Sequence, residues 1–383
     1  MAETEIRVEA GKLDRPAGPV WVTLQDGAGL PEGAAVVVDT ETGQPIPAQV
    51  VADGAMCLWL DGMKAGSTRT LAVKGPDKAA KARVEVKTPT PNTADVLLDG
   101  QPFTTYHGGD DVIRPFLYPV IGPTGKPMTR SFPMKKGVPG EGEDHPHQTS
   151  LYTAWGDVNK VDHWSAQRGP NQGYQKHRKF ITTASGPVFG RIEVLIEWVD
   201  ASGRRQLTEH RTYTVYAPMP DVRVLDTQVA FKLTDGDVTF GDTKEGGLFA
   251  LRVAASMKEA AGGVIVNAAG QRGEKACWGQ PAPWCDYSGP VDGTIVGLTI
   301  LDHPANHGYP TRYHVRAYGL FTANCFGLSH FCKPETKDGT KTWKNGETVV
   351  FRYRLLMHTG GADDANLPAH HALFADPPVV RVR

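Results

Sequence analysis

Glycine and proline place the strongest constraint on what this chain can fold into. The sequence has 43 glycines and 29 prolines, together 72 of 383 residues, or about 19% where roughly 12% is usual. They do not recur with a collagen-like period, so the surplus indicates many turns and therefore many short strands. Apolar runs are short, with residues 294–301 among the longest, whereas a membrane-spanning helix needs about 18 to 20 residues. We expect no membrane partner.

Alternating hydrophobicity predicts the fold class. Ile192, Val194, Ile196 and Trp198 alternate along one segment, the pattern of a strand with a buried face. Another strong apolar run covers residues 349–357, and only residues 364–374 suggest a helix. Strands without helices between them predict an all-β protein with a large antiparallel β-sandwich, not a parallel α/β sheet.

The chain is expected to contain two domains. Residues 1–92 have short alternating runs separated by Gly, Pro and Asp turns, which predicts a small N-terminal β-sandwich. A proline-containing segment at 88–93 would link it to a large β-sandwich over residues 93–383. Within the large domain, residues 119–175 are rich in loop-forming, polar and aromatic residues. A long loop on a rigid scaffold usually carries function.

Charge and cysteine content exclude further classes of partner and of structural site. Lys plus Arg number 41 and Asp plus Glu number 42, which argues against a nucleic-acid partner because phosphate binding needs a basic face. Five cysteines without Cys-x-x-Cys spacing predict free thiols, not a disulfide framework or a structural zinc site. The first residues lack a signal-peptide pattern. We expect a soluble protein, either cytoplasmic or exported with its signal peptide removed; the oligomeric state stays open.

A His-Pro-His motif is the first candidate for chemistry. His145 and His147 flank Pro146, and in an extended segment both imidazoles would face one site. Such a pair suits an acid and a base acting on one substrate, or a divalent metal ion as cofactor. The alternative is two loop histidines that are hydrogen-bonded to the backbone.

A second motif places Lys244 and Glu245 before two glycines, which let a substrate or backbone approach closely. Glu245 is the leading candidate for a general acid or base, with Lys244 as a substrate-binding cation. A salt-bridged surface turn explains the same residues.

The turn-rich segment 278–289 contains Trp284, Asp286 and Tyr287. Aromatic faces beside a carboxylate are how many proteins hold sugars, so we predict that these three bind substrate. Packing of aromatic residues under a long loop is the alternative.

Residues 310–316 add a candidate anion site. On a strand, Arg312, His314 and Arg316 share one face, with Tyr313 and Val315 on the other. We predict a catalytic role for His314 and a substrate-binding role for Arg316, because cations in register suit a carboxylate or an oxyanion. An exposed strand face paired with acids is the alternative.

Four more residues complete the candidate site. We predict that His303 is catalytic. We predict that three others bind substrate: Arg130, Trp155 and His210. Glu193 and Glu197 would lie about 13 Å apart on one strand, too far for the carboxylate pair of a retaining glycosidase. Fingerprints of serine hydrolases, P-loop proteins and dinucleotide-binding proteins do not occur.

Several short motifs occur in order along the chain. They include Arg-Pro-Phe-Leu-Tyr-Pro at 114–119, Asp-His-Pro-His at 144–147, Gly-Asp-Thr-Lys-Glu-Gly at 241–246 and His-Val-Arg at 314–316. With these motifs, residues 97–357 resemble the bacterial PmoA-like family, a domain of unknown function named after a methane-oxygenase subunit. This chain has Gln148 and Cys325 where that family usually has histidine and proline.

The resemblance implies a supersandwich like that of galactose mutarotases, in which one sheet face gathers His, Glu, Arg and aromatic residues around a sugar. Our first hypothesis is an enzyme that acts on a sugar, glycoside or oligosaccharide as a hydrolase, lyase or epimerase, through His and Glu acid–base chemistry. A non-catalytic carbohydrate-binding protein is the second, and a metal-dependent oxygenase the third. The first requires that residues scattered from 145 to 316 meet in one cleft.

Overall fold

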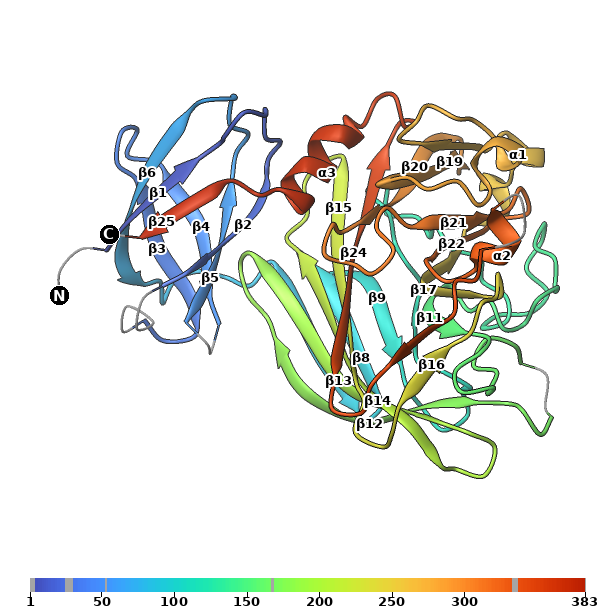
Figure 1. Cartoon of the computed structure of the whole chain (residues 1–383). Helices are drawn as coiled ribbons and strands as arrows, with labels where there is room; N and C mark the ends of the chain where they lie inside the picture. The colour runs from blue at the N-terminus through green and yellow to red at the C-terminus, as the bar shows by residue number, and fades with distance from the viewer. Residues whose placement is uncertain (1–3, 25–29, 52–53, 167–168, 333–336, 383) are drawn as a thin grey trace.

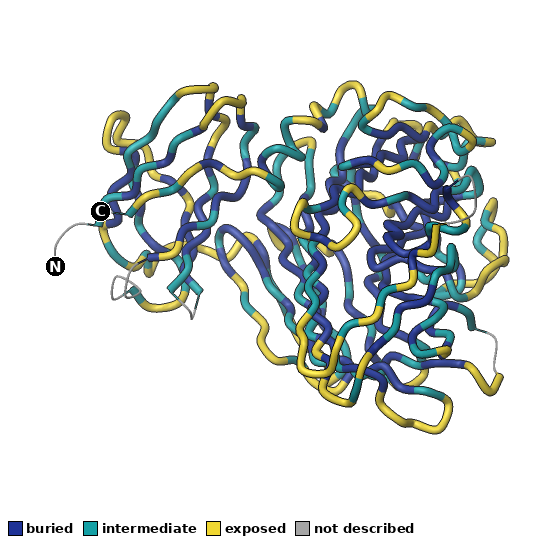
Figure 2. Tube along the Cα trace, viewed as in Figure 1, coloured by how far each residue is buried: buried dark blue, intermediate teal, exposed yellow. Residues whose placement is uncertain are grey.

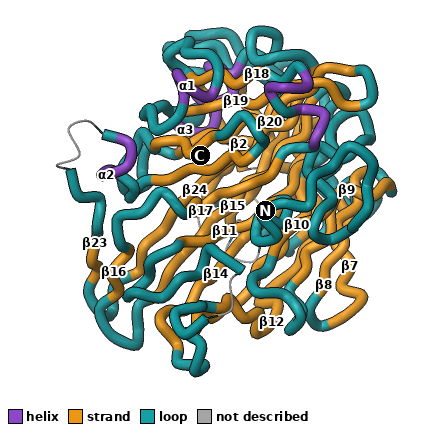
Figure 3. The backbone as a smooth tube through the Cα atoms, turned by 90° about the vertical axis from the view of Figure 1, so that its right-hand side faces the viewer, coloured by secondary structure: helices purple, strands orange, loops and turns teal. Residues whose placement is uncertain are grey.

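The computed structural model describes residues 4–24, 30–51, 54–166, 169–332 and 337–382 (Figure 1). The all-β prediction is confirmed, because strands and loops make up nearly all of the trace in Figure 3. The helices are short: α1 (Glu274–Cys277), α2 (Leu328–Phe331) and α3 (Leu367–Ala375), with 3-10 turns η2 (Ala255–Met257) and η3 (Glu259–Ala261).

A first antiparallel sheet is built almost wholly from the N-terminal part of the chain. Its order is β2 (Gly18–Thr23), β5 (Ala55–Leu60), β4 (Pro45–Val50), β3 (Gly33–Asp39), β6 (Thr68–Pro76), β1 (Thr4–Glu9) and β25 (Val379–Val382). Apolar residues from alternate positions, such as Ile6 and Val8, form its own core. We call this sheet with its core the first module.

Two large antiparallel sheets form the rest of the protein. The cleft sheet, as we name it, has the order β21 (Arg312–Val315), β22 (Leu320–Asn324), β17 (Gly246–Arg252), β11 (Leu151–Trp155), β10 (Phe116–Tyr118), β9 (Gln101–His107), β8 (Thr93–Leu98) and β7 (Val84–Thr90). The backing sheet has the order β12 (Tyr174–Ala184), β13 (Phe189–Val199), β14 (Arg205–Tyr216), β15 (Val222–Lys232), β24 (Thr348–Thr359), β20 (Thr294–Asp302), β19 (Trp284–Val291) and β18 (Val264–Asn267). A small ribbon pairs β16 (Val238–Phe240) with β23 (Lys341–Trp343).

The main core lies between these two sheets, where Figure 2 shows the trace mostly buried. The predicted alternation on β13 holds, since Ile192, Val194, Ile196 and Trp198 are all buried in this core. On β14, Glu209 and Arg211 also point inward and form a buried ion pair. The core therefore contains a compensated charge pair among apolar side chains.

Strand pairing places the division between the two parts before residue 92. β7 pairs with β8 in the cleft sheet, so residues 84–92 belong with the large sandwich, not with the first module. At the other end of the chain, β25 pairs with β1 and completes the first module. The predicted boundary therefore moves to the segment between Pro76 and Val84, and the module also takes in residues 379–382. A boundary read from turn composition cannot reveal either pairing.

Helix α3 forms close to where the sequence predicts it. Pro368 occupies its first turn, where the missing N–H costs little. Leu373 packs into the core of the first module, and Leu367 joins the apolar layer between that module and the backing sheet. In Figure 1 the helix lies between the two parts of the molecule.

Candidate active site

The outer face of the cleft sheet carries the candidate site. Side chains alternate along its strands, so Leu151 and Leu251 enter the core while Tyr152 and Ala250 point away from it. The outward residues also pair from strand to strand across the sheet. One row runs from β21 to β9 in the order His314, Thr322, Ala250, Tyr152, Phe116 and His107.

Two long loops cover this face. The loop between β10 and β11 carries the His-Pro-His motif, and the loop between β11 and β12 carries Trp164. The Trp164 ring lies 5.7 Å from that of Tyr152 and 5.6 Å from that of His147, between ring centroids. The loops therefore form the walls of a cleft whose floor is the outward-facing row.

Six of the predicted residues line one hollow of about 600 Å³ in this cleft, which we call the polar hollow. They come from the His-Pro-His loop, from the turn before β17, and from β21 with the turn after it. The six are His145, His147, Lys244, Glu245, His314 and Arg316. The first hypothesis requires the candidates to meet in one cleft, and these six do so, whereas the other seven do not line this hollow.

His314 is the most constrained of the six. It is 2% exposed, and its Nδ1 lies 2.7 Å from the main-chain oxygen of Lys244. Because a carbonyl only accepts hydrogen bonds, Nδ1 carries the proton and Nε2 keeps its lone pair. Burial lowers the pKa of His314 to about 4, although the bond to Lys244 and the charge of Glu245 oppose the shift. The ring is therefore neutral near neutral pH, and Nε2 is available as a base.

Glu245 forms an ion pair with Lys244, whose Nζ donates to Oε1. Burial raises the pKa of Glu245, but the bond and charge of Lys244, followed by the charges of His314 and His147, lower that pKa on balance. The carboxylate is therefore ionised. Gly156 lies against the backbone of Glu245, since a Cβ at this position would be 2.6 Å from the Glu245 main-chain oxygen.

The His-Pro-His loop reaches the hollow with a geometry that differs from the predicted one. His145 has φ of 48°, so the segment is not extended, yet both histidines line the hollow. Nδ1 of His145 lies 2.6 Å from the carboxylate of Asp144. Burial raises the pKa of Asp144, but His145 and the charges of buried arginines lower it to about 2. Burial and then the charge of Arg114 lower the pKa of His147 to about 4, so His147 is neutral as well.

Arg114 ties the two covering loops together. Its guanidinium is buried and donates to the main-chain oxygens of His147 (2.5 Å), His163 (3.1 Å) and Trp164. Bonds from a charged donor to three carbonyls are strong and directional. The wall on which His147 sits is therefore held in place.

Arg130 does not reach the hollow, contrary to the prediction that it binds substrate. It is fully buried under the His-Pro-His loop, where it donates to the Asp144 carboxylate (2.6 Å) and to the main-chain oxygen of His145 (3.1 Å). Arg252 also donates to Asp144, at 3.3 Å, and to Gln148. Both arginines position the loop.

The predicted sugar platform is not in the cleft. Trp284, Asp286 and Tyr287 lie on β19, an inner strand that is buried on both faces. Trp284 packs in the layer beside the first module, and Asp286 is 2.9 Å from Nε2 of His358. The Tyr287 hydroxyl donates to the main-chain oxygen of Ala317 (2.9 Å), next to Arg316. Tyr287 therefore supports the segment that carries Arg316.

Three other candidates also lie outside the polar hollow. Trp155 is buried in the main core and donates from Nε1 to the Gly241 main-chain oxygen (3.0 Å). His303 lies edge-on to Phe374 of α3, with ring centroids 5.2 Å apart. His210 lies on the solvent side of the backing sheet, 3.9 Å from Glu193. Sequence position alone does not show which sheet face such residues reach.

The aromatic surfaces of the hollow are Trp164 and Tyr318, which the sequence analysis did not select. Tyr318 stacks on the His145 ring at 5.2 Å, and the guanidinium of Arg252 lies 4.5 Å from its centroid. Both had a weak signal, because Trp164 follows His163 in the long loop and Tyr318 lies two residues after the His-Val-Arg motif.

The donor set does not fit a metal ion. Across the part of the chain that the structure describes, no three His, Cys, Asp or Glu side chains are grouped closely enough to hold one. The His145 and His147 rings are 5.7 Å apart and nearly perpendicular, and His145 already uses Nδ1 on Asp144. We assign no metal ligand and derive no step from a metal.

Fold and cleft together define an all-β protein with stacked antiparallel sheets and a cleft lined by histidines and a carboxylate. The chain belongs to a family of unknown function (DUF6807), whose model matches residues 93–372. This match includes residues 97–357, over which the motifs resemble a domain of unknown function. Membership of the PmoA-like family stays a prediction. No curated protein matches the chain.

One solved structure with a similar arrangement is a protein in glycosyl hydrolase family 38 from Enterococcus faecalis. The two are 11% identical with a TM-score of 0.42, over 100% of this chain and 47% of the other. This chain thus spans about half the length of that protein. None of the helices in the described ranges is long and apolar enough to cross a membrane.

Proposed function

We propose that this protein binds a sugar or glycoside in the polar hollow and transfers protons on it. One observation carries the proposal: His147, Glu245 and His314, from segments far apart in the sequence, share a single hollow. General acid–base chemistry needs such groups within hydrogen-bond reach of one substrate. A volume of about 600 Å³ suits a small organic ligand.

The residues divide naturally by chemistry. Nε2 of His314 is a neutral nitrogen whose proton sits on the other side of the ring, so it can take a proton from a substrate hydroxyl or C–H. Lys244 and Arg316, which form ion pairs with Glu245 and Glu274, also line the hollow and can stabilise the negative charge that develops on a substrate oxygen. Tyr318 and Trp164 offer ring faces on which a sugar can stack.

The carboxylates favour elimination or epimerisation over two-carboxylate hydrolysis. Besides Glu245, Asp162 lines the hollow, but its oxygens accept from the Ser165 hydroxyl (2.5 Å) and from the main-chain N–H of Trp164 (2.7 Å). A glycosidase of the usual kind needs two carboxylates free to act as acid and as nucleophile or base. Lys244 bonds to Oε1 of Glu245, so among the described lining residues Oε2 of Glu245 is the carboxylate oxygen left for chemistry, and histidines supply the other groups.

The test is turnover of a panel of sugars, uronates and glycosides by the wild-type protein and two variants. His314→Gln and Glu245→Gln should each lower kcat/KM by about 10²- to 10⁴-fold. His303→Gln, outside the hollow, is the matched control and should keep wild-type activity. Because the reaction needs neutral imidazole, the rate should fall as the pH drops toward 4. Equal rates in all three variants would refute the proposal, and binding without product would point to a carbohydrate-binding protein instead.

A further inference from the structure

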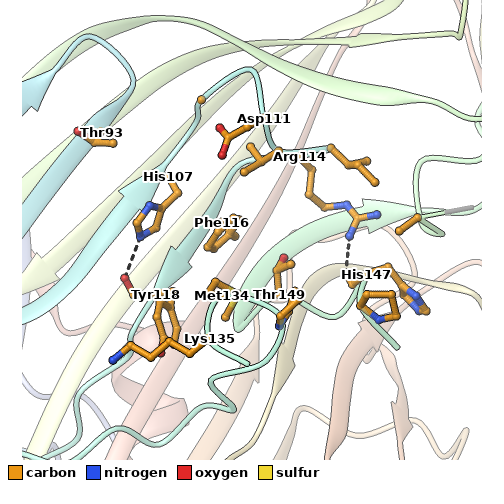
Figure 4. Close-up of a pocket in the computed structure, with 16 residues that line it drawn as sticks. Thr93, His107, Asp111, Arg114, Phe116, Tyr118, Met134, Lys135, His147 and Thr149 are labelled. Carbon is orange, nitrogen blue, oxygen red and sulfur yellow. Dashed lines mark hydrogen bonds between the residues drawn. The ribbon is translucent and has the colours of Figure 1, made fainter. Parts of the chain in front are cut away.

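A second hollow of about 690 Å³ lies beside the polar one (Figure 4). We call it the apolar hollow, and the side chains that set its character are Ile113, Phe116, Tyr118, Pro133, Met134 and Pro146. In Figure 4, Phe116, Tyr118 and Met134 lie together on the side of His107, and His147 lies across from them. Of the three groups proposed for acid–base chemistry, His147 also lines this hollow, whereas Glu245 and His314 do not.

The two hollows are parts of one cleft. Both lie on the outward row of the cleft sheet, which runs from His314 in the polar hollow through Tyr152 to Phe116 in the apolar one. Four strand spacings separate His314 from Phe116, or roughly 19 Å between their backbones. The hollows adjoin between these two positions, because His147 lines both, so a molecule with two joined rings can place one ring on each side of His147.

His147 stands at the junction, because it lines both hollows. Its main-chain oxygen accepts from Arg114, which holds the backbone of His147 in place, and a ligand that occupies both hollows lies beside this residue. The hollows differ in the balance of their lining. Charged and imidazole groups dominate the polar hollow, whereas aliphatic, aromatic and thioether groups make up much of the apolar hollow, which also contains Asp111, Lys135 and His107.

We infer that the apolar hollow binds the apolar aglycone of a glycoside whose sugar occupies the polar hollow. The inference rests on the proposed function and names its substrate class. Ile113, Phe116 and Met134 favour a flat apolar ring, which gains from leaving water against them, and Asp111, Lys135 and His107 in the same hollow can bond to a polar substituent on that ring. The geometry places His147 beside the bond that joins sugar and aglycone.

The experiment measures binding by isothermal titration calorimetry with pairs of methyl and phenyl glycosides of several sugars. It also measures fluorescence polarisation of 4-methylumbelliferone alone, which probes the hollow without a sugar. The wild-type protein should bind the phenyl member of a pair about tenfold more tightly than the methyl member. Met134→Asn and Ile113→Asn should each abolish this preference and the binding of 4-methylumbelliferone. Ile295→Asn, an apolar-to-polar change at an exposed position on β20, should leave both intact.

The outcomes separate this inference from the proposed function. Glycosides that bind without a phenyl preference, or a preference that survives both Asn variants, would overturn the aglycone site while leaving the sugar site standing. Tighter binding of disaccharides than of phenyl glycosides would replace the aglycone with a second sugar. If the sugars fail to bind but 4-methylumbelliferone binds in an Ile113- and Met134-dependent way, the apolar site stands and the proposed function fails. Failure of both kinds of probe overturns both.

Discussion

His163 offers a sharp test of the electrostatics of the cleft wall, and this test needs no substrate. It is 1% exposed, and neither ring nitrogen has a hydrogen-bond partner among the described residues. Its ring lies against Trp198, with centroids 4.8 Å apart. Burial, followed by the charge of Arg114, lowers its pKa to about 3. His163→Phe removes both polar atoms and keeps a ring of similar size.

The magnitude follows from proton linkage. In the unfolded chain the pKa of histidine is about 6.5, so as the pH falls the unfolded state takes up the proton first and the folded state loses relative stability. Between pH 7 and pH 5 the loss is about 2 kcal/mol for any folded pKa well below 5, because each pH unit is worth about 1.4 kcal/mol. His163→Phe should remove this loss. At pH 7 it should also stabilise the fold by about 1 to 3 kcal/mol, the cost of burying unpaired polar atoms.

Urea denaturation at pH 7 and pH 5 measures both effects. His177→Phe is the control, since His177 is also a buried histidine but bonds to the Tyr106 hydroxyl and to the Pro91 main-chain oxygen, each at 3.0 Å. That variant should lower the free energy of unfolding at pH 7. If Phe is too large for the site, it lowers the free energy of unfolding by the same amount at pH 7 and at pH 5. The difference between the two pH values therefore still reports the titration of His163. A His163→Phe slope equal to that of the wild type would contradict the account.

Two further changes test the core and the floor of the polar hollow. Glu209→Gln leaves the Arg211 guanidinium buried without its counter-charge and should lower the free energy of unfolding by about 3 to 5 kcal/mol, measured by urea denaturation. Glu193→Gln, a half-buried surface carboxylate, should cost less than about 1 kcal/mol, and equal costs would argue against a buried ion pair. Gly156→Ala places a Cβ 2.6 Å from the Glu245 main-chain oxygen, and should cost about 1 to 3 kcal/mol and weaken glycoside binding in calorimetry; unchanged binding would show that the backbone moves without disturbing the hollow.

Local pattern was enough to predict the fold class and much of the polar hollow. Alternation on β21 put Tyr313 and Val315 in the core and His314 on the opposite face, which the structure confirms. The prediction that Arg312, His314 and Arg316 share one face of this strand is only partly confirmed. Arg312 donates to the main-chain oxygen of Gly279 outside the polar hollow, and Arg316 follows the end of the strand. Period-two reasoning holds only while the strand lasts.

Pairings between distant segments could not be predicted. The sequence predicts Asp286 as a sugar ligand, but in the structure its partner is His358, which lies on a strand 72 residues further along the chain. Arg130 looked like a substrate contact, but the loop it supports folds over it. Both are polar side chains whose hydrogen bonds are satisfied inside the protein. A single sequence does not distinguish such groups from ones that await a ligand.

The pairing of β25 with β1 has a consequence for synthesis of the chain. A ribosome makes β1 to β6 first, but the last strand of their sheet emerges only after the entire sandwich between them. Until then the edge of β1 that faces away from β6 is unpaired, and such an edge can pair with other nascent chains. The sheet of the first module can therefore be completed only after residues 379–382 have been translated.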